Sequence, residues 1–359
     1  MRESVLKNIF KEVESGYNAR SEKVPWTLRE AGTREVAHRA FGRRPLDFHG
    51  EAMAKEFKTY EELRALLESR GVETDDGTIP ALKRETYYAV VNGYKGPFLD
   101  REAMQSCDHD VFSTGTRFEW IYALFMFDRD LRAVTFKYLQ RAEAIMRSAT
   151  VHAFCEAHPE PDAYLKRESY CKADDFLTPK GFRGNRARLH EKNLAQLLRR
   201  LKGKALPDSP KPAIDHYMRS YGFVPLWVLS KDMTFGNLHH FYQLLERPVQ
   251  KRACRLVLEA SEAPERMIMQ PHDLLRYYSV LVEFRNLCAH DERLYCAKVG
   301  KSRDIDYSQM GTCLLNVIQQ EQFEFFLEEI MECFRTYGRD LKVVDMDSLL
   351  SDMGFKLEK

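Results

Sequence analysis

This chain of 359 residues lacks paired cysteines, long apolar runs and a surplus of charge of either sign. Its eight cysteines are scattered with no Cys-x-x-Cys pair, a usage typical of a reducing cytoplasm and not of a disulfide scaffold. The longest apolar run, residues 121–127, is far too short to span a bilayer. Residues 1–4 lead directly into a charged helical pattern, so we expect no signal peptide. These features predict a soluble, cytoplasmic protein without a membrane partner.

Motifs for nucleotide and metal chemistry are also missing. The chain has no glycine-rich phosphate loop, no Walker pattern and no Gly-x-Ser-x-Gly elbow. Cys288, His290 and Cys296 lie close in sequence, but zinc sites usually show paired ligands at short fixed spacing, and this group has no second pair. We therefore expect no cofactor and no metal.

Helical patterns dominate the sequence. Thr59 with Glu62 is typical of a capping box, and Gly71 stands where that helix would end. Residues 118–158 contain no glycine or proline, and their apolar side chains recur at three- and four-residue steps, which predicts a long helix or a broken pair. In the C-terminal segment, one helical stripe is apolar and consists of Phe323, Phe326, Leu327, Ile330 and Phe334. The best strand pattern, residues 342–344, is short. The predicted fold is therefore all-α.

Composition divides the chain into regions. We expect a helical N-terminal region over residues 1–114, a larger helical domain over residues 115–340 and a tail over residues 341–359. Residues 159–222, which are dense in proline, glycine and charge, interrupt the larger domain as an insertion.

A local surplus of basic residues lies inside that insertion. The whole chain has 55 Lys and Arg against 54 Asp and Glu, so any attraction to an anion must be local. Residues 183–204 carry eight Lys or Arg against one Glu. This stretch is the best candidate for a phosphate-binding surface, although a solvated helix face is an equal alternative. The arginines that we select as candidate RNA contacts there are Arg183, Arg186, Arg188, Arg199 and Arg200.

The most informative segment is RNLCAH, residues 285–290. The Arg285 guanidinium is a permanent cation that can fork onto a phosphate, and His290 is a side chain suited to moving protons near neutral pH. Together they suffice to cleave RNA without a metal. Arg-x4-His also occurs by chance, and the two side chains could simply cap helix carbonyls or pair with Asp291 or Glu292.

Helix geometry limits how these two residues can work. Residues five apart lie about 140° around a helix axis, so Arg285 and His290 would not share a face of an uninterrupted helix. Asn286 and His290, four apart, would share one. Either the helix ends near residues 288–289, or the two side chains face different parts of a seam between subunits.

Five blocks in order resemble the Abi-like, or abortive infection, family of bacterial phage-defence proteins of the AbiD/AbiF type. They are residues 59–72 (TYEELRALLESRGV), 87–98 (YY with NGY and PF), 127–132 (FDRDLR), 225–236 (PLWVL with TFG) and 285–294 (RNLCAH with RL). Many members carry a second histidine directly after the last motif, and here that position is Asp291.

The last block is similar to the Arg-x4-6-His motif of HEPN domains, which are helical modules often found as metal-independent ribonucleases. This resemblance implies a HEPN-like bundle and a site in which two motifs face each other. Since the chain has one copy of the motif, it also implies a homodimer. His290 would be the general acid/base, Arg285 would bind the scissile phosphate, and Asn286 would orient the motif.

Several neighbouring residues have two interpretations. The charges of residues 128–132 either form an ion-pair network within the bundle or lie beside the motif. Glu143 is a candidate to position Arg285. Arg293 either touches a flanking phosphate or pairs with Asp291 or Glu292. We expect Trp227 and Phe235 to lie in the core.

The leading functional hypothesis is an abortive-infection ribonuclease that leaves a 2′,3′-cyclic phosphate and a 5′-OH. The alternative is a catalytically idle module that holds a structured non-coding RNA. A third hypothesis is a protein that contacts only other proteins.

Overall fold

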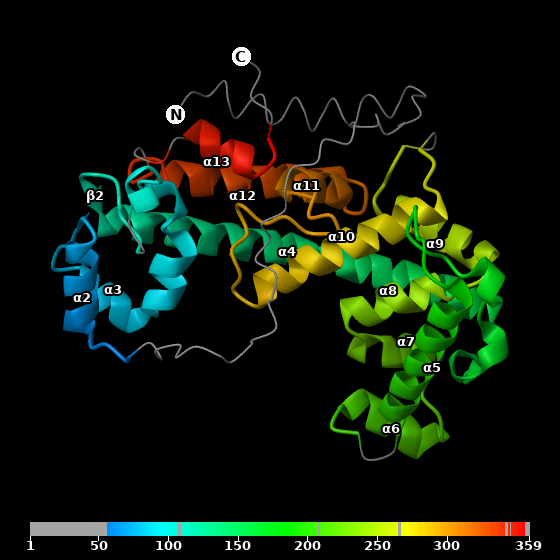
Figure 1. Ribbon diagram of the computed structural model, residues 1–359. Coiled ribbons are helices and arrows are strands. Elements are labelled where there is room, and N and C mark those ends of the chain that lie inside the picture. Colours follow the sequence, from blue (N-terminus) through cyan, green and yellow to red (C-terminus); the bar gives the residue numbers. More distant parts are fainter. Residues whose placement is uncertain are drawn as a thin grey trace. The chain divides into compact units, whose positions relative to one another are not determined.

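The computed structural model describes residues 56–106, 109–206, 209–264, 267–341, 344 and 346–355 (Figure 1). The all-α prediction is confirmed, because helices make up most of these ranges. Within the same ranges, no helix is both long enough and apolar enough to cross a bilayer. The described residues divide into two compact units, residues 56–121 and residues 122–355.

The smaller unit begins with the predicted capping box. Thr59 Oγ1 accepts a hydrogen bond from the Glu62 N–H at 3.2 Å, and Glu62 Oε2 accepts one from the Thr59 N–H at 2.7 Å. The helix ends before Gly71, whose φ of +92° lies in the left-handed region that glycine tolerates. The unit contains α2 (Tyr60–Ser69), β1 (Val72–Glu73), α3 (Thr78–Arg84), a π-helical turn (Tyr88–Asn92), 3₁₀ turns (Gly96–Phe98 and Ala103–Ser106) and β2 (Thr116–Arg117).

The strands of this unit were not expected from the sequence. β1 and β2 pair in parallel, with Val72 opposite Thr116 and Glu73 opposite Arg117. The strand that the sequence does predict, at residues 342–344, lies outside the described residues except for Val344.

The larger unit is a bundle built on one long helix, α4 (Phe118–Ala157). It contains α5 (Arg186–Lys204), α6 (Pro212–Tyr221), α7 (Leu226–Leu229), α8 (Phe235–Gln243), α9 (Arg247–Ala260), α10 (Pro271–Ala289), α11 (Tyr307–Leu315), α12 (Gln320–Tyr337), α13 (Met346–Asp352) and 3₁₀ turns (Ala163–Leu165, Arg167–Ser169, Ala173–Asp175 and Ser230–Asp232). The predicted long helix is thus one unbroken helix of 40 residues.

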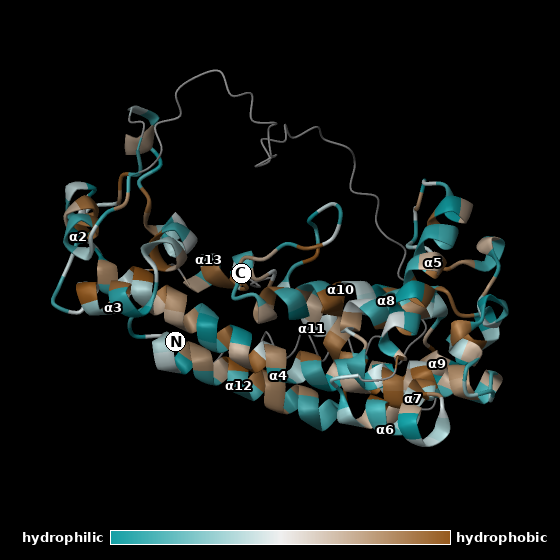
Figure 2. Ribbon diagram, turned by 90° about the horizontal axis from the view of Figure 1, so that it is seen from below, coloured by the Kyte–Doolittle hydropathy of each residue, from teal (hydrophilic) through white to brown (hydrophobic). Residues whose placement is uncertain are grey.

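α12 packs antiparallel to α4. The Phe127 ring lies 4.9 Å from the Phe334 ring, and the Tyr138 ring lies 5.2 Å from the Phe326 ring, measured between centroids. The apolar stripe predicted for the C-terminal segment is confirmed, and Figure 2 shows hydrophobic and hydrophilic residues alternating along both helices. The members of that stripe, Phe323, Phe326, Leu327, Ile330 and Phe334, are all buried.

α10 also runs antiparallel to α4, and the two helices lie side by side in Figure 1. The Tyr278 hydroxyl shares a hydrogen bond of 2.8 Å with Thr150 Oγ1 and donates one of 3.0 Å to the Met146 carbonyl. α8 packs on the same helix α10. This arrangement determines which α4 side chains can reach the end of α10.

The two aromatic residues expected in the core behave differently. Phe235 is 1 % exposed, as predicted, but the prediction for Trp227 is wrong, because its side chain is 53 % exposed. α7 is only four residues long and buries Leu226 and Leu229, so Trp227 points away from the core.

Phe334→Ala should lower the free energy of unfolding by about 3–5 kcal/mol, because it removes a buried ring and leaves a cavity beside Phe127. Phe325→Ala on the same helix is the matched control, since that ring is 43 % exposed, and its effect should be small. Urea unfolding of both variants measures the difference. Equal losses would contradict the assignment of the buried face of α12.

Candidate active site

Helix α10 ends at the predicted motif. Its last helical residue is Ala289, and His290 follows with φ −102° and ψ 12°, donating its N–H to the Asn286 carbonyl at 2.9 Å. Of the two arrangements left open by the sequence, the one in which the helix stops near residues 288–289 is the one observed. His290 therefore leaves the helical path and its side chain is exposed.

Arg285 lies in the last turn and a half of α10, where two side chains hold it. Its Nε lies 3.5 Å from Glu143 Oε2 of α4, in an ion pair, and its Nη1 donates to Asn286 Oδ1 at 3.3 Å. The Arg285 side chain is 27 % exposed, whereas the Glu143 carboxylate is 11 % exposed. Glu143 therefore lies beside Arg285, where it can position the guanidinium group as the sequence suggested.

Glu143 is itself held by a second arginine, which the sequence analysis missed. Arg147, one turn further along α4, pairs with Glu143 Oε1 and donates to the carbonyls of Ser230 and of Met233, the latter at 2.7 Å. The Glu143 carboxylate is thus shared between two guanidinium groups. The i,i+4 spacing of Glu143 and Arg147 was the one sequence signal for this pair.

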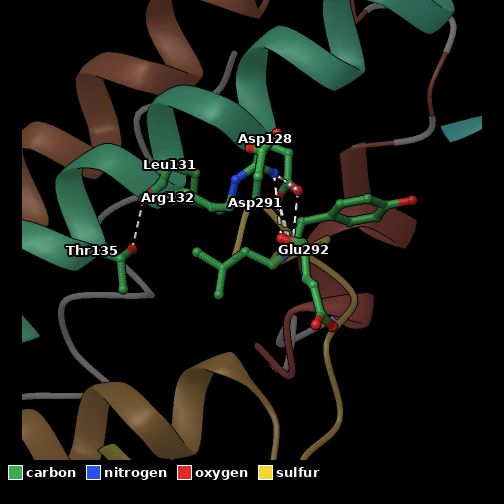
Figure 3. A network of polar contacts seen from close by, with 8 residues as sticks. Asp128, Leu131, Arg132, Thr135, Asp291 and Glu292 are labelled. Atoms are coloured by element: carbon green, nitrogen blue, oxygen red, sulfur yellow. Dashed lines mark hydrogen bonds and ion pairs between the residues drawn. The ribbon is translucent and has the colours of Figure 1, made fainter. Parts of the chain in front are cut away.

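The turn after the motif is held by a buried carboxylate. Asp128 is 0 % exposed, and its two oxygens accept the backbone N–H groups of Leu294 at 2.9 Å and of Tyr295 at 2.7 Å (Figure 3). It also pairs with Arg132 Nη1 at 2.7 Å. A carboxylate can be buried when it accepts this many bonds from N–H groups and a cation.

Arg132 binds the same turn through other atoms, and we call Asp128 and Arg132 together the clamp. Its Nη2 lies 2.5 Å from Asp291 Oδ1, and its Nη1 donates to the Glu292 carbonyl at 3.4 Å. Asp291 has a φ of +56°, a left-handed conformation in which aspartate is tolerated better than most residues. Asp291 thus anchors the turn to α4.

Both arrangements that the sequence suggested for the charges of residues 128–132 are therefore observed. Asp128 and Arg132 form an ion pair inside the bundle, and the same pair lies directly against the turn that follows the motif. Asp130, by contrast, accepts a hydrogen bond from the Tyr337 hydroxyl of α12 at 2.6 Å.

The cysteines near the motif have the character of packed, protonated thiols. Burial raises the pKa of the Cys288 thiol to about 12 and also raises the pKa of Cys296. A thiol has to be deprotonated to bind zinc tightly. Within the described residues, no group of three His, Cys, Asp or Glu side chains has the arrangement of a metal site.

The basic residues of α5 fall into two sets. Arg186 donates to the Asp174 carbonyl at 3.2 Å, Arg200 donates to Asn237 Oδ1 at 2.7 Å, and Lys204 pairs with Asp232. These three side chains tie the helix to the rest of the unit. The exposed arginines Arg183 and Arg293 lie in loops, Arg293 in the turn held by Arg132.

The second set forms what we call the basic stripe: Arg188, Lys192, Arg199 and Lys202. Their spacing of four, seven and three residues keeps them within an arc of about 80° on a 3.6-residue helix. All four are exposed, and none of their side chains makes a hydrogen bond or ion pair with another of the described residues. Lys192 and Lys202 were not among the candidates chosen from the sequence, which cannot distinguish the two sets.

The fold and this site define a helical protein with an arginine, an asparagine and a histidine at the end of one helix, positioned by acidic and basic residues of another. The family model described as Abi-like protein matches residues 80–296, which is more than half of the chain. The chain belongs to this family, and membership indicates a role in abortive-infection phage defence. Neither the curated proteins nor the solved structures contain a significant match.

Asp128→Ala should destabilise the protein by about 3–5 kcal/mol, because it leaves the Arg132 guanidinium buried without its main partner. The backbone N–H groups of Leu294 and Tyr295 should exchange with solvent faster for the same reason. Denaturant unfolding and hydrogen exchange measure the two effects.

Asp215→Ala is the matched control for this variant. Asp215 and Arg219 form an ion pair with the same i,i+4 spacing, but their side chains are 28 % and 65 % exposed. An exposed pair contributes about 0–1 kcal/mol. If Asp128→Ala cost no more than Asp215→Ala, the clamp would not be what holds the turn.

Proposed function

We propose that this protein is a metal-independent endoribonuclease of HEPN type that acts in abortive-infection phage defence. The observation that carries the proposal is the arrangement at the end of α10. A half-buried arginine is held by Glu143 and Asn286, and an exposed histidine stands where the helix stops. Phosphodiester cleavage by an internal nucleophile is assisted by a fixed cation and by a group able to move protons, and the end of α10 carries both.

In the proposed reaction the 2′-OH of a nucleotide attacks its own 3′-phosphate. His290 of one copy accepts the proton of that hydroxyl, and Arg285 stabilises the extra negative charge on the phosphate oxygens. The bond from phosphorus to the 5′-oxygen then breaks, and that oxygen takes a proton from His290 of a second copy. The products are a 2′,3′-cyclic phosphate and a 5′-OH.

Two copies are needed because one imidazole cannot be protonated and unprotonated in the same step. Each chain supplies one copy of the motif. A homodimer with both motifs at its seam provides the acid and the base together, as well as two arginines for the phosphate.

The RNA is held mainly by cations outside the motif. The basic stripe has no acidic partner among the described residues, which leaves its charges available for phosphates. Arg183 and Arg293 are further candidates for phosphate contacts. Arg186 and Arg200 already bond to protein groups, so we propose that they contribute less to RNA binding than the stripe does.

A catalytically idle RNA-binding module is the second candidate. One observation favours it: the His290 ring makes no hydrogen bond within the described part of the chain, whereas catalytic histidines are usually oriented by a partner. In that case Arg285 and His290 would hold a structured non-coding RNA without cutting it.

His290→Ala should abolish RNA cleavage, with a loss of about 10²–10⁴-fold in rate, because the proton acceptor and donor is removed. It should leave stability nearly unchanged, since the side chain is exposed. Single-turnover cleavage of a labelled single-stranded RNA measures the rate. His152→Ala, which removes another exposed histidine, is the control and should cleave normally.

Cleavage should persist in excess EDTA, because the mechanism uses no metal. Full activity of His290→Ala would contradict the catalytic role of the histidine. RNA that the wild-type protein binds tightly but never cuts would favour the idle module.

The wild-type protein should be a dimer in light scattering, and His290→Ala should act in a dominant manner. If every site needs His290 from both copies, a co-expressed equal mixture should keep about a quarter of the wild-type activity, since only dimers with two wild-type chains are active. Independent monomers would keep about half. An equal mixture with His152→Ala should stay fully active.

A further inference from the structure

Aromatic rings gather on α6, on the neighbouring α7 and in the turn between them. We call Tyr217, Tyr221, Phe223 and Trp227 the aromatic platform. Tyr221 is 59 % exposed, Phe223 is 38 % exposed and Trp227 is 53 % exposed. The Tyr217 and Tyr221 rings lie 5.4 Å apart and the Tyr221 and Phe223 rings 6.4 Å apart, measured between centroids.

The backbone that carries these exposed rings is anchored to the rest of the unit at several points. α6 ends at Gly222, whose φ of +74° reverses the chain and brings Phe223 back beside Tyr221. The next carbonyl, that of Val224, accepts a hydrogen bond of 2.7 Å from the buried Tyr164 hydroxyl. Together with the buried Leu226 and Leu229 of α7, these anchors hold the platform in place.

A groove rich in positive charge is lined by the residues that follow Tyr164 in the chain. Residues 165–168, which follow Tyr164, form one wall, and α5 forms the other with Ala195, Leu198, Arg199 and Lys202. The groove has a volume of about 610 Å³. Four cations and one acidic residue line it: Lys166, Arg167, Arg199, Lys202 and Glu168.

Only part of this positive charge is neutralised by the protein. Lys166 pairs with Asp162 at 2.7 Å, and Arg167 pairs with Glu191. Arg199 and Lys202 belong to the basic stripe, which has no acidic partner in the described residues. The groove therefore attracts anions, while the platform, which is linked to it through the hydrogen bond between Tyr164 and Val224, offers flat apolar surfaces.

We propose that the groove and the aromatic platform together bind single-stranded RNA. The phosphates lie along Arg199 and Lys202, and unpaired bases stack on Tyr221, Phe223 and Trp227. Every base has a flat face that stacks on an aromatic ring, whereas the bases of a duplex are not accessible for such stacking. This assignment rests on the proposed function, because it takes RNA as the ligand and specifies its single-stranded form.

The platform is also connected to the motif through the protein. The Trp227 carbonyl accepts a hydrogen bond of 3.1 Å from Ser230 Oγ, and the Ser230 carbonyl accepts one from Arg147. Arg147 pairs with Glu143, the partner of Arg285. An RNA strand bound to the platform would thus contact a segment that is hydrogen-bonded to Arg147, and Arg147 pairs with the carboxylate that holds Arg285.

A second copy of the chain is the other possible occupant, and the charge distribution disfavours it. A twofold contact places the same surface of each copy against the other. The cations of the groove would then face the same cations, at an electrostatic cost that an RNA backbone does not incur.

Leucine substitutions test the stacking directly. Tyr221→Leu and Trp227→Leu keep an apolar side chain but remove the flat ring. In full-length protein that also carries His290→Ala, each should weaken binding of a 12-nucleotide single-stranded RNA at least about fivefold, since stacking contributes about 1–3 kcal/mol per base. Trp227→Phe should retain most of the affinity. Binding of the same RNA as a duplex should change little.

The salt dependence separates stacking from charge. The leucine variants should leave the slope of log K against log salt unchanged, whereas Arg199→Gln with Lys202→Gln should lower it by about 1.4, at about 0.7 for each phosphate that is no longer neutralised. Phe325→Leu, on a 43 % exposed ring of α12, is the control and should bind normally.

Two results would overturn the proposal. One is unchanged single-strand affinity in both leucine variants, whether or not self-association is lost in light scattering. The other is an equal loss for single strand and duplex. Because binding is measured without cleavage, ring-dependent binding by a protein that never cuts RNA would refute the nuclease proposal and leave the platform standing.

Discussion

The rest of the structure depends on one buried carboxylate, that of Asp128. Removing a charge from water is costly, and Asp128 offsets this cost by accepting two backbone N–H groups and pairing with Arg132. These bonds cannot form if α10 slides along α4 or if its last turn continues. Burial of Asp128 is therefore favourable only when α10 ends at Ala289, and this fixes the position of His290 at the end of the helix.

Helix α4 contacts α10 and the turn that follows it at three points. Along it, Thr150 contacts Tyr278, Glu143 contacts Arg285, and Arg132 contacts Asp291, in strictly antiparallel order. Each contact is polar and directional, so a shift of one residue would break all three. Different parts of α4 thus hold Arg285, through Glu143, and the turn that follows His290, through Arg132.

The electrostatics of the protein are local, as a net charge of +1 requires. Some cations of α5 attach the helix to the rest of the unit, while those of the basic stripe are exposed and have no partner among the described residues. The proposed action on RNA depends on two features, this charged surface and the half-buried Arg285. Both features lie in the larger unit, and both are supported by residues 224–233 between α6 and α8.

The sequence by itself determined what depends on neighbours within about one helical turn. It predicted the capping box at Thr59, a long helix or a broken pair over residues 118–158, and the apolar stripe that α12 buries. Glu143 was only a candidate to position Arg285, and the ion pair between them is a contact between two helices that local patterns do not specify. Only the tertiary structure decided that Asp128 is buried while Asp130 bonds α12, that Trp227 is exposed and which α5 cations have partners. The reason is physical: these outcomes depend on groups that are distant in sequence, 167 positions for Tyr295 and Asp128 and 207 positions for Tyr337 and Asp130. No local periodicity records which of two nearby charges will meet such a group.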